Sequence, residues 1–333
     1  MRRRVTLPAV LLGLMTLAPG LARAQTATTP SQLYRLGDKS LFQQGCFAPC
    51  LCPILLSGPV EGTFRLTLAP PDPLFTVYQV TEVNWLVRMG DSDVRITGSG
   101  TYRIGGEFAL MEQLQLDLKV DNQDVQQFDS GLVAGGSEFP AINLTVATNS
   151  LTCNNTAITV AALPLPDAQI VPYRLSGSEY LVGCFGPCDC AVTGRPTDGR
   201  FGLVKLSQLN GAVDFAVVNV NWRIGSLTGS LTDSVPVSGF GIYRVVSATA
   251  MQRMLLDLTL DGKGPQRFDS GTVPGGGDLR RIDLALAANG FACFDQVFEL
   301  HARRLRATVT TQTARPEREP MWLKQSHKSF DTP

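Results

Sequence analysis

Eight cysteines are the residues of this sequence best suited to forming covalent links. They fall into two sets of four: Cys46, Cys50, Cys52 and Cys153, then Cys184, Cys188, Cys190 and Cys293. Four thiolates could instead hold a zinc ion in a tetrahedral site. Three residues and then one residue separate the clustered cysteines, whereas zinc sites commonly have two residues between them. Together with the export signal described below, this spacing favours two disulfides in each set and no metal.

Each set of four cysteines allows three pairings. Cysteines two apart on an extended strand, such as Cys50 and Cys52, point the same way with Cα atoms about 7 Å apart, at the limit for a disulfide. Without that pairing, each set has one bond inside its cluster and one long bond across a loop of about 100 residues. The expected long bonds join Cys153 to Cys50 or Cys52, and Cys293 to Cys188 or Cys190.

Histidine is too scarce for the common nucleophilic sites. The chain contains only His301 and His327. A Ser-His-Asp or Cys-His site therefore cannot exist in the first half of the sequence. His301 falls within an expected strand, and a surface position there is the simpler interpretation.

Carboxylates are the remaining candidates for catalysis or ligand binding. Asp117 and Asp129 recur as Asp257 and Asp269 in a similar sequence context. Two such groups could act as acid and base in glycoside hydrolysis. That function would require Asp117 to approach Asp129, and Asp257 to approach Asp269, in a solvent-filled cleft. The simpler interpretation is an Asx turn for Asp129 and Asp269, which precede Ser-Gly, and a polar strand face for the other two.

Aromatic residues offer further candidates. Trp85 and Trp222 lie on the apolar side of their expected strands, which favours core packing over a platform for stacking sugars. The Tyr-Arg pairs could mark a polar pocket or the end of a barrel, or simply a buried ring beside an exposed charge. These pairs are Tyr102 with Arg103 and Tyr243 with Arg244.

The elements that would position these residues occur twice, at a shift of about 140 residues. Several short motifs return in the same order. They are Cys46-Phe47-Ala48-Pro49-Cys50-Leu51-Cys52 with Cys184-Phe185-Gly186-Pro187-Cys188-Asp189-Cys190, Val83-Asn84-Trp85 with Val220-Asn221-Trp222, and Phe128-Asp129-Ser130-Gly131 with Phe268-Asp269-Ser270-Gly271. Gly98-Ser99-Gly100-Thr101-Tyr102-Arg103 likewise matches Gly239-Phe240-Gly241-Ile242-Tyr243-Arg244. This order indicates a tandem duplication of one domain.

Each copy has the composition and periodicity of a β structure. The chain is 44% hydrophobic and 17% charged, with 32 Gly and 21 Pro, which is too apolar for disorder and too rich in turns for a helical bundle. Leu and Val alternate with polar residues from Leu114 to Val120, as a half-buried strand requires. The sequence therefore predicts an all-β fold of two tandem homologous antiparallel domains, each a disulfide-stapled β-barrel or β-sandwich of seven to ten strands.

The limits of these domains follow from the flanking segments. Arg2 to Ala24 has the basic, apolar and small-residue order of a secretory signal. We therefore expect a signal peptide over 1–24, β domains over 31–165 and 170–308, and a disordered tail over 309–333. The alternating prolines of Leu163-Pro164-Leu165-Pro166 predict an extended, poorly paired linker. No later segment is apolar enough for a membrane span, so the protein is expected to be secreted, either periplasmic or extracellular.

Charge excludes one class of partner. Without the four Arg of the predicted signal, 25 basic residues remain against 29 acidic ones, a formal charge of −4. Residues 31–165 carry −6 and residues 167–308 carry +1. Nucleic acid needs a concentrated basic face, so it is not an expected partner. An extracellular ligand or protein is expected instead, and no cofactor.

The motifs listed above resemble those of a group of uncharacterised exported bacterial proteins built from the same Cys-Phe-x-Pro-Cys-x-Cys and Phe-Asp-Ser-Gly repeat. This resemblance covers both copies but not the tail, and it implies no activity. From the residues we expect an exported, non-enzymatic binding or structural protein. The alternative is a carboxylate-dependent hydrolase of an extracellular polymer.

Overall fold

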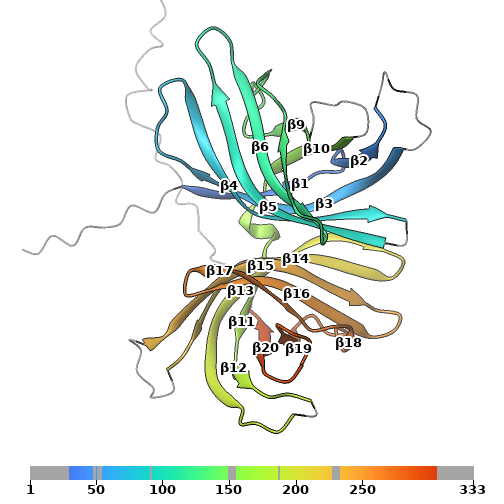
Figure 1. The fold of residues 1–333 in the computed structure, drawn as a ribbon, viewed down its shortest axis with the longest axis vertical. Coiled ribbons are helices and arrows are strands. Elements are labelled where there is room, and N and C mark those ends of the chain that lie inside the picture. Colours follow the sequence, from blue (N-terminus) through green and yellow to red (C-terminus); the bar gives the residue numbers. More distant parts are fainter. Residues whose placement is uncertain are drawn as a thin grey trace, which may run out of the picture.

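A computed structural model describes residues 30–47, 50, 55–90, 92–148, 155–186, 188–226 and 233–305. The predicted signal peptide, the predicted tail, Cys52 and Cys153 lie outside these residues. The described chain is almost entirely β-strand, and it forms two separate sheets (Figure 1). The predicted all-β, antiparallel fold class is thus confirmed.

The first sheet closes on itself through antiparallel pairs. Strand β10 pairs with β9, β1 and β2, and β3 pairs with both β1 and β2, so the order β3-β4-β5-β6-β7-β9-β10 returns to its start. The resulting first barrel contains β1 (Ser31–Leu36), β2 (Leu41–Gly45), β3 (Leu55–Leu68), β4 (Phe75–Met89), β5 (Ser92–Gly105), β6 (Met111–Val120), β7 (Val125–Asp129), β8 (Val133–Ala134), β9 (Ile142–Ala147) and β10 (Asn155–Pro164).

The second sheet repeats this strand order and closes in the same way through β20, β11, β12 and β13. This second barrel contains β11 (Val171–Leu175), β12 (Ser178–Gly183), β13 (Thr193–Leu209), β14 (Ala212–Ile224), β15 (Val235–Val246), β16 (Met251–Leu260), β17 (Lys263–Asp269), β18 (Val273–Pro274), β19 (Arg281–Ala287) and β20 (Asp295–Arg304).

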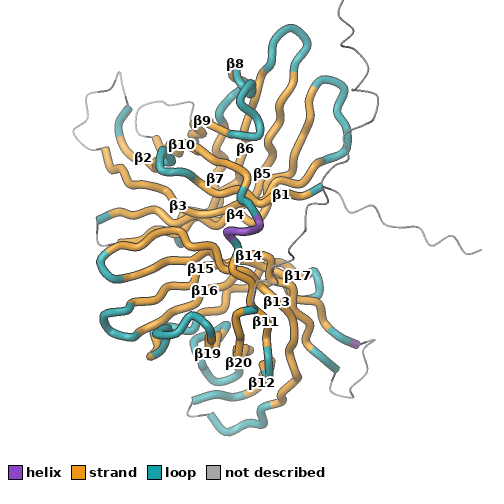
Figure 2. Tube along the Cα trace, turned by 180° about the vertical axis from the view of Figure 1, so that it is seen from behind, coloured by secondary structure: helices purple, strands orange, loops and turns teal. Residues whose placement is uncertain are grey.

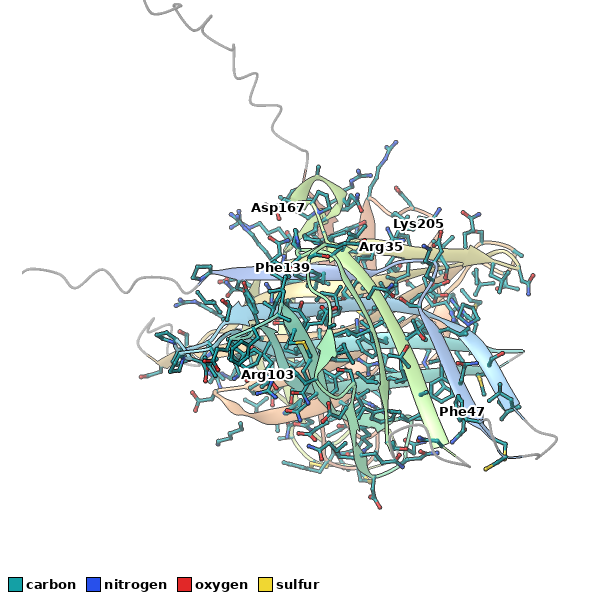
Figure 3. The ribbon with its side chains drawn as sticks, turned by 90° about the horizontal axis from the view of Figure 1, so that it is seen from above. Arg35, Phe47, Arg103, Phe139, Asp167 and Lys205 are labelled. Carbon is teal, nitrogen blue, oxygen red and sulfur yellow. A yellow bond between two sulfur atoms is a disulfide. The ribbon has the colours of Figure 1, made fainter. Side chains whose placement is uncertain are left out.

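Aromatic and aliphatic side chains fill each barrel. Trp85 is 1% exposed and meets Phe64 edge to face, and Trp222 meets Phe201 and Phe298 in the same manner. Viewed from above, side chains occupy the space between the strands throughout the molecule (Figure 3). Both tryptophans are therefore core residues, as the period-two pattern predicts.

The repeated Gly-x-Gly motif is explained by close strand packing. A Cβ atom on Gly100 would lie 2.0 Å from the carbonyl oxygen of Gln115, and one on Gly241 would lie 2.0 Å from that of Leu255. Real Cβ atoms do not approach a backbone oxygen so closely. Only glycine allows β5 to lie against β6, and β15 against β16, at these positions.

The linker between the barrels differs from the extended, unpaired segment predicted from its prolines. Strand β10 continues to Pro164, and the Leu165 N–H donates to the carbonyl of Leu33 at 2.7 Å. Proline lacks an N–H, but the alternate residues of this stretch still donate hydrogen bonds. The linker then forms the short 3₁₀ turn η1 (Asp167–Gln169), which lies between the two barrels (Figure 2).

The outer faces of the two barrels pack against each other around an apolar cluster. Leu33 and Leu165 of the first half contact buried side chains of the second, namely Val204, Leu206, Ala216, Val218 and Ile242.

No helix among the described residues is long and apolar enough to cross a membrane.

Replacing either core tryptophan should unfold the protein. We expect Trp85→Ala and Trp222→Ala each to lower the free energy of unfolding by roughly 3–5 kcal/mol, because a large cavity opens in a packed core. Urea denaturation followed by circular dichroism measures this change. Gln79→Ala, on the exposed face of β4, is the matched control and should change stability by less than about 0.5 kcal/mol. Equal stability of the tryptophan variants and the control would contradict a core role.

Candidate functional site

A groove lies between the two barrels and is lined by residues from both. Its larger part has a volume of about 590 Å³. The first barrel contributes Asp117, Lys119 and Val125 beside strand β5, and the second contributes Phe240, Asp257, Pro265 and Arg267. We call this the interbarrel groove. It brings Asp117 and Asp257, which occupy matching places in the two halves, to the same hollow.

A smaller hollow of about 300 Å³ adjoins the interbarrel groove, because Arg267 lines both. Its walls are rich in charge and its floor contains aliphatic side chains. The lining residues are Leu86, Asp93, Arg95, Asp121 and Asn122 of the first barrel, and Ile242, Arg244, Arg253, Leu255, Arg267 and Asp269 of the second.

Asp257 is held by two guanidinium groups. Its Oδ2 lies 2.9 Å from Nη1 of Arg95, across the barrel boundary, and its Oδ1 lies 3.3 Å from Nε of Arg267. The Arg95 side chain is 8% exposed, and this burial lowers its pKa while the charge of Asp257 opposes the shift. Both oxygens of Asp257 thus already contact cations, so its contribution to the groove is mainly structural.

Asp117 and Lys119 are charged side chains of the groove that remain available to a ligand. Both lie on the outer face of β6 and are exposed. Among the described residues, neither side chain has a hydrogen-bond or ion-pair partner. Phe240, which is partly buried, supplies an apolar ring on the opposite wall.

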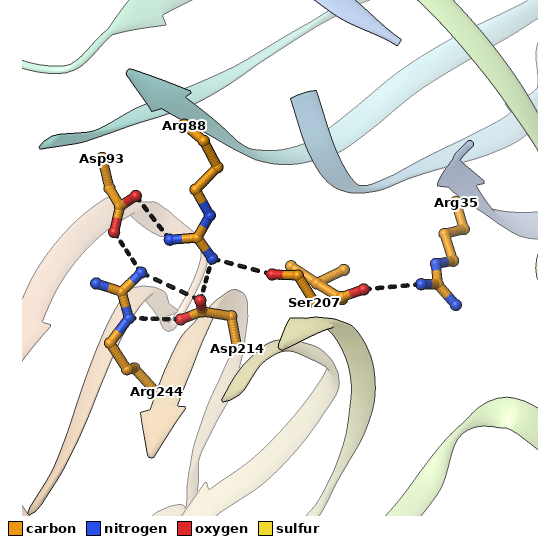
Figure 4. A network of polar contacts seen from close by, with 7 residues as sticks. Arg35, Arg88, Asp93, Ser207, Asp214 and Arg244 are labelled. Carbon is orange, nitrogen blue, oxygen red and sulfur yellow. Dashed lines mark hydrogen bonds and ion pairs between the residues drawn. The ribbon is translucent and has the colours of Figure 1, made fainter. Parts of the chain in front are cut away.

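A four-residue ion-pair network connects the barrels next to the groove (Figure 4). Asp214 is 1% exposed, and its carboxylate accepts hydrogen bonds from Arg88 of the first barrel and from Nε of Arg244 at 2.7 Å. Asp93 of the first barrel binds the same two arginines, with 2.6 Å to Nη1 of Arg88. Partial burial would raise the pKa of Asp93, but hydrogen bonds from Arg88 and Arg244 outweigh it, so the pKa lies below its usual value.

The boundary has further direct contacts between the barrels. Asn84, fully buried on β4, donates from Nδ2 to the carbonyl of Gly241 at 2.7 Å. Arg35 donates from Nη2 to the carbonyl of Leu206 at 3.0 Å, and Arg88 donates to Oγ of Ser207 at 3.0 Å. These contacts fix the shape of the groove.

The two Tyr-Arg pairs do not form matching pockets. Tyr102 and Tyr243 are buried inside the barrels, where their hydroxyls donate to Oε2 of Glu112 at 3.0 Å and Oε1 of Gln252 at 2.8 Å. Burial raises the pKa of each tyrosine. Arg244 belongs to the ion-pair network, and burial acts against its charge while hydrogen bonds to Asp214 raise its pKa.

Arg103, by contrast, stays within the first barrel. Its Nε donates to Oε1 of Gln113 at 2.8 Å, and its guanidinium lies 4.7 Å from the ring centre of Phe75. The matching arginines of the two halves thus have different roles.

Asp129 and Asp269 stabilise the turns at the seam of each barrel. Strand β7 pairs with β9 only at Asp129 and Ala147, and β17 pairs with β19 only at Asp269 and Ala287. Each carboxylate accepts from the N–H two residues on, that of Gly131 at 2.7 Å and that of Gly271 at 2.8 Å. The Asx-turn interpretation of these two residues is confirmed.

Side-chain partners also hold these two carboxylates in their charged form. Burial would raise the pKa of Asp129, yet hydrogen bonds from Gln115 and Gln113 lower it overall. Burial acts the same way on Asp269, where Arg253 lowers the pKa. The carboxylate oxygens of Asp129 and Asp269 therefore already have hydrogen-bond partners within the protein, and these two residues serve the fold.

The predicted carboxylate pairs do not share a hollow. Asp117 lines the interbarrel groove, whereas Asp129 lines a separate hollow near Thr145 and Thr148. Asp257 and Asp269 likewise line different hollows. The structure instead brings together Asp117 and Asp257, from opposite barrels.

Sequence reasoning missed Lys119, Phe240 and Arg267 in the groove and Arg95 in the adjoining hollow. One signal could have indicated Phe240. Phe240 stands where the first half has Ser99, although both lie on the outward face of a β-strand. An aromatic residue that appears in only one copy, on an outward position, has no role in the core of the repeat.

The cysteines of the second barrel form two disulfides, Cys184–Cys190 and Cys188–Cys293. The latter spans 105 residues and is one of the two long pairings that the sequence left open. In the first barrel Cys46 and Cys50 each belong to a disulfide, while Cys52 and Cys153 lie outside the described residues, so the predicted pairing there stays a prediction. The cysteines of the two disulfides of the second barrel do not line the interbarrel groove, and the bonds serve to stabilise the fold.

His301 lies on strand β20, and its Nδ1 is 2.8 Å from Oδ1 of Asp283. The imidazole is 42% exposed, which agrees with a surface position. Within the part of the chain that the structure describes, no three His, Cys, Asp or Glu side chains are placed to hold a metal ion.

Comparison with known proteins gives no match: no family model fits the sequence, and neither a curated protein nor a solved structure is similar to it. The resemblance to exported repeat proteins stays a prediction.

Removing the shared carboxylate of the ion-pair network should destabilise the protein. We expect Asp214→Asn to lower the free energy of unfolding by roughly 3–5 kcal/mol, because Arg88 and Arg244 lose a buried counter-charge. Thermal and urea unfolding measure the loss. Asp198→Asn, an exposed outer position with no ion-pair partner among the described residues, is the control. A loss no larger than that of the control would show that the network does not hold the barrels together.

Stability should fall at low pH. The pKa values of Asp93, Asp129, Asp269 and Asp283 lie below normal in the folded protein. The unfolded chain therefore takes up protons first, and stability present above about pH 4 decreases as pH falls through the folded pKa values. Melting temperatures measured from pH 7 to pH 3 test this. Asp93→Asn should reduce the slope below pH 4, and an unchanged slope would contradict the assignment.

Proposed function

We propose that this chain is an exported, non-enzymatic binding protein that holds an extracellular ligand in the interbarrel groove. The observation that carries the proposal is the convergence of residues from both barrels on one hollow of about 590 Å³. Concave sites at the boundary between two folded units are common places for ligand binding.

The lining chemistry favours a ligand that is polar but carries no net charge. Two carboxylates, Asp117 and Asp257, face two cations, Lys119 and Arg267. Asp117 can accept hydrogen bonds from ligand hydroxyls, and Lys119 can donate to ligand oxygens. The ring of Phe240 offers an apolar surface against which the C–H face of a sugar can pack. A neutral oligosaccharide fits this combination.

Export is part of the proposal. Disulfides persist in oxidising compartments such as the periplasm and the extracellular space. The disulfides of the second barrel and the signal-like segment over residues 1–24 both support such a location. The duplication inferred from the sequence explains how a groove could arise between two similar barrels.

A hydrolase of an extracellular polymer is the second candidate, because Asp117 and Asp257 face the same groove. Glycoside hydrolysis needs one carboxyl group that donates a proton and one that acts as base or nucleophile. Arg95 and Arg267 contact both oxygens of Asp257, which leaves neither oxygen free to face a glycosidic bond. Release of reducing ends from polysaccharides distinguishes the two functions, and the binding proposal expects none.

Groove substitutions should weaken binding without unfolding the protein. We expect the wild-type chain to bind at least one member of a panel of neutral oligosaccharides in titration calorimetry. Asp117→Asn and Phe240→Ala should each reduce that affinity by roughly tenfold, since each removes a contact worth about 1–2 kcal/mol.

Asp124→Asn, in the exposed turn between β6 and β7, is the matched control and should bind as the wild type does. Wild-type protein that binds none of the panel, or groove variants that bind as well as the control, would overturn the proposal. Circular dichroism confirms that each variant is folded before binding is measured.

A further inference from the structure

A row of arginine side chains crosses the outer face of the second barrel. Arg281 on β19 stands directly opposite Arg303 on β20, and Arg303 stands opposite Arg174 on β11. Arg174 in turn stands opposite Arg200 on β13. Four arginines thus occupy one line across four neighbouring strands, which lie side by side in the lower part of Figure 1. We call this the arginine row.

The side chains of the row all point away from the barrel core. Residues directly opposite each other in an antiparallel pair share one face of the sheet. Tyr173 and Leu175, on either side of Arg174, are 1% and 3% exposed and face inward. All four arginines of the row are exposed residues. The row is therefore open to solvent along its length.

The row carries charge that the protein does not neutralise. Only Arg281 has an acidic partner, Asp283, with 2.5 Å between Nε and Oδ2. Among the described residues, the side chains of Arg174, Arg200 and Arg303 have no ion pair or hydrogen bond. Like charges directly opposite on neighbouring strands destabilise a sheet. The row thus costs stability, and a function outside the fold would account for it.

Two further arginines extend the charge at the start of β19 and the end of β20. Arg280, whose side chain is 88% exposed, accepts at its carbonyl a backbone hydrogen bond from the N–H of Arg304. Acidic groups also lie near the row: Asp283 contacts Arg281 and His301, Asp278 lies 3.9 Å from Arg280, and the exposed Asp198 is two residues from Arg200 on β13. The row itself contains no acidic residue, so the line of charge across the four strands is positive.

The first barrel shows that the fold does not require the row. Arg174 corresponds to Arg35, whose register partners are Leu163 and Thr63. Ala141 precedes Ile142 just as Arg281 precedes Ile282. The guanidinium of Arg35 is used at the barrel boundary, where it donates to the carbonyl of Leu206. Three of the four arginines are thus peculiar to the second barrel.

We propose that the arginine row binds a linear acidic polysaccharide through carboxylate or sulfate groups on successive sugars. Neighbouring strands are about 4.8 Å apart, so the guanidinium groups repeat at a distance comparable to the length of one sugar ring. Guanidinium forms paired hydrogen bonds with planar or tetrahedral oxyanions. This site is separate from the interbarrel groove and does not depend on the function proposed for it.

Other polyanions fit the row less well. Single-stranded nucleic acids need aromatic rings on which bases stack, and the row contains none. A membrane surface needs apolar anchors beside the basic groups, and the large exposed apolar residues of the described second barrel, Val192, Leu209, Phe291 and Phe294, lie outside strands β11, β19 and β20. A flat row of evenly spaced cations favours an extended, regularly charged chain.

Affinity electrophoresis and titration calorimetry with polygalacturonate and dextran sulfate test the proposal, with uncharged dextran as the reference polymer. Wild-type protein should bind at least one charged polymer and not dextran, and the affinity should fall as salt is raised from 50 mM to 200 mM. The double variant Arg174→Gln/Arg303→Gln should lose roughly tenfold or more in affinity, because it removes two charge-assisted contacts. Lys263→Gln, at the exposed start of β17 in the same barrel, removes one positive charge outside the row and is the control.

Thermal unfolding separates binding from structure. The double variant should melt at the wild-type temperature or above, since it relieves repulsion between Arg174 and Arg303. Phe240→Ala should leave binding of the charged polymers unchanged, which keeps this test independent of the groove. Equal retention by dextran and the charged polymers, full affinity in the double variant, or stronger binding to single-stranded DNA than to either polysaccharide would each overturn the proposal.

Discussion

The buried carboxylate of Asp214 determines how the two barrels are placed against each other. It lies on the second barrel but binds Arg88 of the first as well as Arg244 of its own. A buried ion has a large desolvation cost unless its hydrogen bonds are met with good geometry. The network therefore favours one relative position of the barrels, in which Asp93 completes the contacts of both arginines. The interbarrel groove exists only in that arrangement.

The contact between the barrels is not symmetric, although the barrels are similar. Asn84 is buried and bonds to Gly241, whereas its counterpart Asn221 is exposed. Asp214 is matched in the first barrel by Val77, which precedes Tyr78 as Asp214 precedes Phe215. A two-fold contact would use the same surface on both partners. The two barrels do meet through matching strands, with β4 and β5 facing β14 and β15. The side chains at matching positions differ, however, so the individual contacts are not equivalent.

The sequence predicts well which side chains face the core of each barrel. Alternation of apolar and polar residues places Trp85 and Trp222 in the core, and turn chemistry explains the Asp of each Phe-Asp-Ser-Gly motif. The groove was not predictable in the same way. Arg88 and Asp214 are 126 residues apart, and no local pattern indicates that they meet. Period two gives the face on which a side chain lies, but it does not say which outward faces will be covered by the other barrel.

Comparison of the two halves supplies part of the missing information. Residues that are the same in both halves and residues that differ between them are subject to different structural requirements. Residues that recur, such as Gly100 with Gly241 and Ser130 with Ser270, meet requirements of barrel packing and closure. Outward positions that differ are not bound by those requirements. Phe240 in the groove and Arg303 in the arginine row are both of this kind. Because the two halves share the same strand order, the outward differences between them are the most direct guide to residues that serve binding rather than folding.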